Sequence, residues 1–158
     1  MPLRAGRITP RDMNDRDWAT YVQQSGIQAD RSIKSFTPTW GNDFSADPTG
    51  DISYYDFGVM VVLWVDTPVT GTSDTVTFSL AGLPEEIQPK YTGYSRIVMC
   101  YLADNNLGVQ GGGYIDDSGT ITFGLAQVVG TEIQLDTASF TAAGVKGLPG
   151  GWLFQYTK

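Results

Sequence analysis

The segment Thr75-Val76-Thr77-Phe78-Ser79-Leu80 decides the fold class, because apolar and hydroxyl-bearing residues alternate along it. In an extended chain successive side chains point to opposite faces, so this period of two predicts a half-buried β-strand. The same alternation returns at residues 120–125 and at residues 152–156, where aromatic residues occupy every second position. Three such segments in one short chain favour antiparallel sheets with one face in the core.

Turn sequences divide the rest of the chain into further segments of strand length. Residues 104–106 (Asp-Asn-Asn) and 116–119 (Asp-Asp-Ser-Gly) predict hairpin turns, since these residue types tolerate the left-handed backbone of tight turns. We expect further strands at residues 36–40, 54–65, 94–102, 107–115 and 132–135, with loops at residues 41–50 and 67–74. About eight strands with no helical pattern between them predict an all-β domain over residues 35–158, an antiparallel β-sandwich of jelly-roll type.

The composition excludes most routes to catalysis. The 158-residue chain has no histidine and a single cysteine, Cys100. Histidine-based catalysis and the common zinc and haem ligand sets are therefore excluded, as is a site of several thiolates. We expect no enzyme activity, no cofactor and no metal, and we expect Cys100 to be buried and unreactive. The net charge of −7 argues against a nucleic-acid-binding surface.

Residues 1–34 differ from the rest of the chain in charge and pattern. They hold six basic residues against four acidic ones, whereas residues 35–158 hold four basic against thirteen acidic ones. Three apolar side chains of this arm fall at helical spacing between two aspartates and a Ser-Gly pair, which predicts a helix of about ten residues. Such a helix is marginal alone in water, so the arm either packs on its own domain or docks on a neighbouring subunit. The candidate docking residues are Arg4, Arg7, Arg11, Trp18, Tyr21 and Val22.

Residues 59–65, Val-Met-Val-Val-Leu-Trp-Val, are apolar on both faces of the expected strand. A strand with one face in water would carry polar residues at alternate positions. This run therefore predicts burial on both sides, either between two sheets or against a partner chain.

Two groups of carboxylates are candidates for a metal or catalytic site. Asp43, Asp47 and Asp51 offer oxygen ligands for a cation, but their spacing does not match an EF-hand loop, and a solvated loop explains them as well. The pair Glu85 and Glu86 is of the kind that glycosidases use, yet it stands in a chain where acidic residues are plentiful. Neither group predicts a catalytic or metal site.

The aromatic residues are more informative, because several tyrosines lie beside loops or strand ends with Asp and Asn nearby. Such rings can stack on the apolar faces of sugars while the polar neighbours bind the hydroxyl groups. The candidates for contact with a glycan are Tyr54, Tyr55, Tyr91 and Tyr94. Packing at a strand edge or at a subunit interface is the alternative explanation.

Several phrases of the sequence, in this order, resemble those of bacteriophage tail-fibre and minor tail proteins. Residues 36–40 (Phe-Thr-Pro-Thr-Trp) are similar to the opening strand of that family, and residues 54–58 (Tyr-Tyr-Asp-Phe-Gly) to the step before its long second strand. Residues 75–84, which end in Gly-Leu-Pro, are similar to the corner that closes its first hairpin. A late glycine-rich hairpin and the aromatic terminal strand complete the likeness over residues 35–158.

The resemblance implies a virion structural protein, a β-sandwich module that is commonly a homotrimer and in some cases contacts host-surface glycans. It brings no catalytic residue. Since the chain has no repeat-rich shaft and no heptads, we expect a compact knob held on tail or capsid subunits by the arm. With no secretory signal and no apolar run of membrane-spanning length, it is expected to assemble in the host cytoplasm without membrane insertion. A capsid decoration or head-fibre protein and a carbohydrate-binding module are the alternatives.

Overall fold

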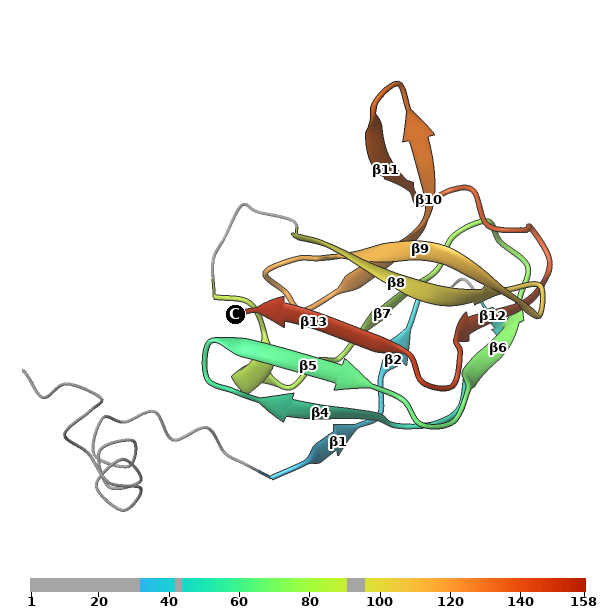
Figure 1. Ribbon diagram of the computed structural model, residues 1–158. Coiled ribbons are helices and arrows are strands. Elements are labelled where there is room, and N and C mark those ends of the chain that lie inside the picture. The colour runs from blue at the N-terminus through green and yellow to red at the C-terminus, as the bar shows by residue number, and fades with distance from the viewer. Residues whose placement is uncertain (1–31, 42–43, 91–95) are drawn as a thin grey trace, which may run out of the picture.

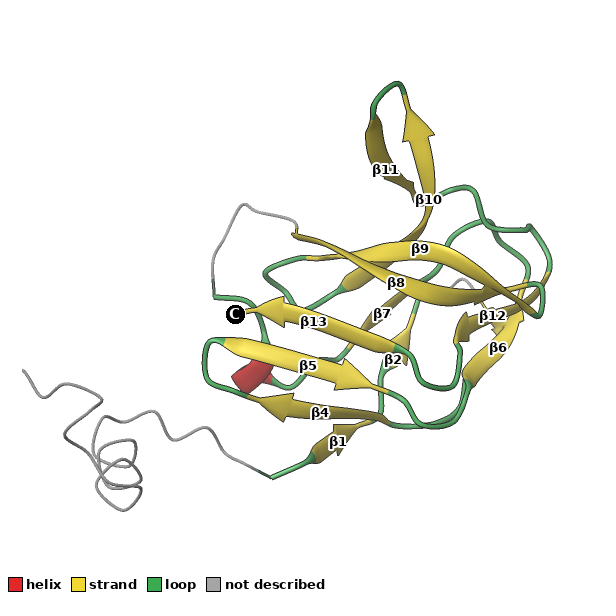
Figure 2. Ribbon diagram, viewed as in Figure 1, coloured by secondary structure: helices red, strands yellow, loops and turns green. Residues whose placement is uncertain are grey.

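The computed structural model describes residues 32–41, 44–90 and 96–158, which form an antiparallel all-β structure (Figure 1, Figure 2). Strands make up 56% of the described residues and helix 3%, so the prediction of an all-β chain is confirmed. The predicted arm helix and the six candidate docking residues lie outside the described residues, as do Asp43, Tyr91 and Tyr94.

The described part of the chain contains more and shorter strands than the sequence predicts. In chain order the elements are β1 (Lys34–Phe36), β2 (Thr39–Trp40), β3 (Phe44–Ala46), β4 (Ile52–Asp56), β5 (Met60–Trp64), β6 (Val69–Ser73), β7 (Ser79–Ala81), the 3-10 helix η1 (Glu85–Ile87), β8 (Arg96–Asp104), β9 (Leu107–Ile115), β10 (Ile121–Val129), β11 (Glu132–Asp136), β12 (Gly144–Leu148) and β13 (Leu153–Thr157). The first strand begins at Lys34, one residue before the expected start of the domain.

These strands form two antiparallel sheets. A four-stranded sheet has the order β1-β4-β5-β13, and a long sheet has the order β2-β7-β10-β9-β8-β12-β6-β3, with β11 paired to β10. The edge strands β2 and β3 are neighbours in sequence, and the rings of Trp40 and Phe44 on them have centroids 5.7 Å apart. The long sheet therefore curls into a nearly closed, barrel-like layer. In the smaller sheet, β13 runs beside β8 (Figure 1).

An aromatic core lies between the two sheets. Phe78 stacks on Phe123 with 4.6 Å between ring centroids, and Trp152 stacks on Phe154 at 5.6 Å. Trp152, Phe154 and Tyr156 are all buried on the inward side of the C-terminal strand, so the predicted aromatic face at residues 152–156 is confirmed. Burial of each large apolar side chain contributes about 1.5–3 kcal/mol, which makes this last strand a main source of stability.

Residues 54–65 form a hairpin of β4 and β5 and not the one long strand that the sequence predicts. Tyr55 pairs with Val62 across this hairpin, and the chain reverses through residues 57–59. Gly58 has φ of +90°, and its N–H donates to the Asp56 carboxylate at 2.7 Å. A short turn built on glycine and an aspartate side chain therefore interrupts what looks like continuous strand sequence.

Three strands lie where the sequence predicts none. They are β3 inside the expected loop at residues 41–50, β6 inside the expected turn at residues 67–74, and β12. Their own strand propensity is low, but β6 pairs with β12 on one side and with β3 on the other. Partners that are distant in sequence thus override weak local preference. Conversely, residues 75–80 contribute only to the short strand β7, and Val76 is exposed.

Both predicted hairpin turns are confirmed. Asn105 and Asn106, between β8 and β9, have φ of 50° and 64°, the left-handed pair that a two-residue type I′ turn requires. Between β9 and β10, the Asp116 carboxylate accepts hydrogen bonds from the N–H groups of Ser118 and Thr120, each at 2.9 Å. These two turns fix the register of the hairpins that they close.

Buried polar groups fix the ends of two strands and the centre of a third. Lys146 on β12 is fully buried, and its ammonium group donates to the Ser73 hydroxyl at 3.0 Å and to the Thr75 carbonyl. The buried Asp104 carboxylate on β8 accepts from the N–H and the hydroxyl of Thr141. Because a buried charge must be hydrogen-bonded, these contacts fix the ends of β6 and β8 and the centre of β12.

The hairpin of β10 and β11 projects from the long sheet (Figure 1). Its base is seated on glycine: a Cβ at Gly112 would lie 3.0 Å from the Leu135 side chain and 2.6 Å from the Val98 carbonyl oxygen. The Tyr114 hydroxyl donates to the Leu135 carbonyl at 3.4 Å beside this contact. Gly112 therefore serves close packing of the hairpin base on β9.

We expect Gly112→Ala to lower the free energy of unfolding by about 1–3 kcal/mol, as overpacking does at a well-packed site. Gly108→Ala on the same strand is the matched control, because no atom lies within 4 Å of a Cβ built there. It should change stability by less than about 0.5 kcal/mol. Urea denaturation followed by tryptophan fluorescence measures both, and equal effects would contradict the seating of the hairpin on Gly112.

Candidate functional site

The doubly apolar strand β5 has its two sides in different environments. Val61 and Leu63 point into the core and are fully buried. Met60, Val62 and Trp64 point to the other side of the sheet and are half-buried. The sequence predicts burial on both sides of β5. The inward side is fully buried, whereas the residues on the outward side are only half-buried.

Neighbouring strands extend this outward side into an apolar surface. Tyr55 on β4 lies opposite Val62, and Leu153 on β13 lies opposite Trp64. Leu153 is 55% exposed, although it is the leucine of a strand whose alternate residues form the core. We call the five side chains Tyr55, Met60, Val62, Trp64 and Leu153 the outer face. In Figure 1 no other described segment crosses in front of β4, β5 and β13.

The apolar surface continues from the outer face onto β8. The alternate residues Ile97, Met99 and Tyr101 are 51%, 44% and 64% exposed. Ile97 also lines a shallow hollow of about 240 Å³ together with residues 155–157 of β13. An exposed apolar surface that spans two sheets is larger than the scattered hydrophobic residues of a typical monomer surface, and such surfaces mark interaction sites.

A second exposed apolar site lies on the projecting hairpin. Val128 and Ile133 are cross-strand partners near its tip and are 74% and 65% exposed. A two-stranded hairpin is marginal in water unless it packs on another element. This hairpin packs at its base only, so its tip is also suited to contact with a partner.

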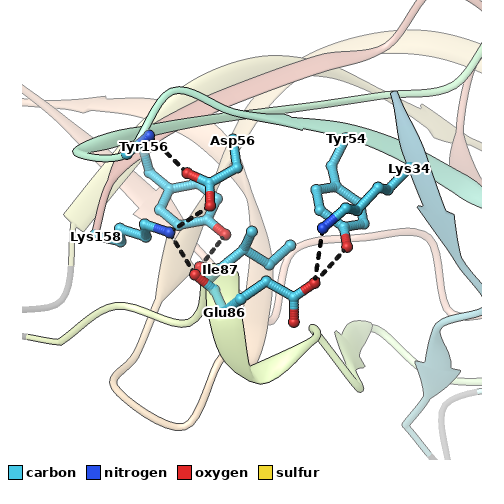
Figure 3. A network of polar contacts seen from close by, with 8 residues as sticks. Lys34, Tyr54, Asp56, Glu86, Ile87, Tyr156 and Lys158 are labelled. Atoms are coloured by element: carbon cyan, nitrogen blue, oxygen red, sulfur yellow. Dashed lines mark hydrogen bonds and ion pairs between the residues drawn. The ribbon is translucent and has the colours of Figure 1, made fainter. Parts of the chain in front are cut away.

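A polar network lies at the end of the four-stranded sheet, next to the 3-10 helix η1 (Figure 3). The Lys158 ammonium pairs with the Asp56 carboxylate at 2.6 Å and donates to the Glu86 carbonyl at 2.5 Å. The Tyr54 hydroxyl donates to the Glu86 carboxylate at 2.8 Å, and Lys34 lies 3.7 Å from the same oxygen. Each of these charged groups is thus engaged by a neighbour.

Burial and these hydrogen bonds shift three pKa values. Burial, followed by the hydrogen bond to Glu86, raises the pKa of Tyr54 to about 12. Burial also raises the pKa of Tyr156, whose hydroxyl donates to the Ile87 carbonyl at 2.6 Å. The pKa of Glu86 is lowered, first by a backbone hydrogen bond and then by the Tyr54 hydroxyl. Because a catalytic acid needs a raised carboxyl pKa, the network suits a structural clamp better than general acid catalysis.

The structure separates the predicted glycan-contacting tyrosines. Tyr54 is 3% exposed and packs edge-on against Phe36, so it offers no ring face to a ligand. Tyr55 is half-buried on the outer face, 4.4 Å from the ring of Phe57. Tyr91 and Tyr94 fall outside the described residues. The described residues therefore do not form an exposed surface of four tyrosine rings.

The other candidate residues are placed as follows. The hydroxyl of Thr37 donates to the Asp51 carboxylate at 2.5 Å. Within the described ranges, no three His, Cys, Asp or Glu side chains are grouped so that they could hold a metal ion. Cys100 is half-buried, and burial raises the pKa of its thiol to about 11, which disfavours the reactive thiolate as the sequence predicts.

The sequence pattern does not predict that apolar residues of β8 and of the hairpin tip are exposed. The signal for β8 is present, because residues 97–102 are apolar on both faces, as residues 59–65 are. The hairpin tip carries no such signal, since its valines and isoleucine read as ordinary strand residues. Only the departure of β10 from β9 after Leu125 exposes them.

Comparisons of this chain with protein-family models, with curated proteins and with solved structures found no match. No helix among the described residues combines the length and hydropathy of a membrane span. The function of the chain is therefore inferred from its own residues and geometry.

We expect stability to fall as the pH rises above about 10, the ordinary tyrosine pKa. Tyr54 and Tyr156 have raised pKa values in the folded state. Above pH 10 their hydroxyl groups therefore lose protons in the unfolded chain while the folded chain still keeps them. Their contribution is complete below pH 10 and is lost above it. Urea midpoints at about pH 8 and about pH 11 measure the drop.

The variant Tyr54→Phe/Tyr156→Phe tests which side chains cause this loss. It should show a smaller drop between the same two pH values, while Tyr101→Phe, at an exposed site, should behave like the unmodified chain. A drop of the same size in the double variant would contradict the assignment.

Proposed function

We propose that this chain is a structural protein of a bacteriophage particle, with an antiparallel β-sandwich body of jelly-roll type that is held in a larger assembly. The observation that carries the proposal is the uncovered outer face of β4, β5 and β13. Leu153 is 55% exposed beside half-buried Trp64 and Val62, whereas a protein that works alone normally keeps such an apolar sheet face packed. A subunit of an assembly covers it with a partner.

The order of the sequence phrases supports the bacteriophage assignment. The phrases that resemble tail-fibre and minor tail proteins fall at structural junctions of the described body. Residues 54–58 form the end of β4 and the start of the turn into β5, and the Gly-Leu-Pro corner follows β7, with Gly82 at φ of +86° and Leu83 buried. Residues that determine turns and corners are those that a shared fold has to keep.

The arm is proposed as the docking device on the particle. Arg4, Arg7 and Arg11 precede the apolar stripe of Trp18, Tyr21 and Val22, while residues 35–158 carry a large excess of acidic residues. Arginines can form bidentate pairs with carboxylates of a tail or capsid subunit, and burial of the stripe would order the helix. A homotrimer on the surface of the virion, with host-glycan contact by its outer loops, completes this proposal.

Two other functions remain as alternatives to a tail knob. A capsid decoration or head-fibre protein differs only in its position, and electron microscopy of particles labelled in the exposed hairpin turn at Gly130 would separate the two. A carbohydrate-binding module is favoured by the exposed ring of Tyr101, which is 64% exposed beside the polar side chain of Gln110. Glycan binding by the isolated protein that is lost in Tyr101→Ala would support that second function.

Deletion of residues 1–30 tests the proposed function. We expect a folded body, because the buried core residues of the described chain lie between Trp40 and Tyr156, and we expect its incorporation into phage particles to fall at least tenfold. The full chain with Leu107→Gln, a change at a residue that is 66% exposed and belongs to neither candidate interaction surface, is the control and should be incorporated normally. Quantitative immunoblotting of purified particles measures occupancy, and full occupancy by the truncated chain would exclude the docking role of the arm.

A further inference from the structure

We propose that residues 14–25 of one copy lie on the outer face of a neighbouring copy, so that copies of this chain join head to tail. This inference rests on the proposed function, in which the arm docks on another subunit of the particle, and it narrows that subunit from any tail or capsid protein to a second copy of the chain. The helix predicted from Trp18, Tyr21 and Val22 is the occupant, and the side chains of β4, β5 and β13 form its seat.

The size of the outer face fits one short helix. Three strands of five residues, spaced by about 4.8 Å with a rise of about 3.4 Å, cover roughly 250 Å². A stable contact between two folded bodies usually buries about 800 Å² on each partner, so this face alone is too small for one. A helix of about ten residues is about 15 Å long and 10 Å wide, which matches the sheet.

The chemistry of the two surfaces is complementary. The seat offers an apolar floor of Val62 and Trp64 with Met60 at one end, and Gln155, opposite Val62 on β13, donates its amide N–H to the Met60 sulfur at 2.7 Å. Two of the three arm residues are aromatic, and aromatic side chains contribute large contact areas at low entropic cost. Met60 can adapt to the shape of an aromatic ring, because its thioether side chain is unbranched and polarizable.

Charge favours contact between arm and body over contact between two bodies. Residues 35–158 hold thirteen acidic and four basic residues, and two of those four are already engaged, Lys146 in the core and Lys158 with Asp56. Two such bodies repel each other at close range. Residues 1–11 contain three arginines and no acidic residue, whereas the predicted helix holds Asp15 and Asp17 against Arg16, so the positive charge that the arm brings to a neighbouring body comes from the residues before the helix.

The position where the arm joins the body allows this crossing. The first described strand, β1, is the edge of the same four-stranded sheet and lies two strands from β5. Twelve residues from Val22 to Lys34 span at most about 40 Å when extended, which is enough to pass from one sheet edge to the face of an adjacent copy. Each copy then gives one arm and receives one, and such heterologous contacts close into a ring.

Two full-length variants with complementary defects test the exchange. The arm variant is Trp18→Ser/Tyr21→Ser, and the face variant is Val62→Gln/Leu153→Gln. The unmodified chain should form an oligomer in light scattering after size-exclusion chromatography, and each variant alone should have the mass of one chain, 17.2 kDa. A mixture should form a complex of twice that mass, because the intact arm of the face variant can bind the intact face of the arm variant.

Matched controls separate this result from loss of folding. The variant Val76→Gln/Leu107→Gln makes the same chemical change at two exposed residues outside the outer face and the hairpin tip, and should keep the oligomer. Leu153→Gln alone changes a residue that is 55% exposed, so it should fold normally and still weaken association. Circular dichroism of every variant confirms the fold before its mass is interpreted.

The outcomes decide between the neighbour and the alternatives. A mixture that stays monomeric while the unmodified chain is an oligomer would overturn the inference in favour of an arm seated on its own body. A monomeric unmodified chain would overturn it too, and its incorporation into particles would leave the proposed function standing. An oligomer that joins through arm and face but is absent from particles would support the inference and contradict the proposed function.

Discussion

The structure depends on one close contact between its two sheets, that of the Phe154 ring with the bare backbone of Gly113. A Cβ at Gly113 would lie 2.9 Å from the Phe154 ring and 2.7 Å from Ile121, so only glycine lets β13 approach the long sheet so closely. Through this contact the ring joins the stack that leads by way of Trp152 to Phe123. Protein interiors are close-packed, and the position of β13 therefore fixes the remaining core.

The same strand also generates the candidate interaction surface. Because side chains alternate along a strand, the register that places Phe154 and Tyr156 in the core must place Leu153 on the outside. In the four-stranded sheet β5 obeys the same rule, with Val61 and Leu63 inside and Val62 outside. The apolar outward residues thus have no described layer to pack against, which is the situation of a subunit before assembly.

The polar groups of the body serve the fold more readily than they serve catalysis. Lys158 pairs with the Asp56 carboxylate and donates to the backbone carbonyl of Glu86, and these contacts hold η1 at the end of the sheet (Figure 3). Lys146 is used in the same way in the core, with the Ser73 hydroxyl as a partner. Because these charged side chains are engaged within the fold, recognition of a partner would rely mainly on exposed apolar surface. This is consistent with the proposed role in an assembly.

The sequence by itself determined the all-β class, the two longest hairpins and the aromatic inward face of the last strand, because each depends on residues that are adjacent in the chain. It also marked residues 59–65 as apolar on both sides. Only the tertiary structure decided that β3, β6 and β12 exist, since their hydrogen bonds come from strands far away in sequence. It also decided that Tyr54 is buried while Leu153 and Tyr101 are exposed, because burial depends on which layers meet and not on residue type.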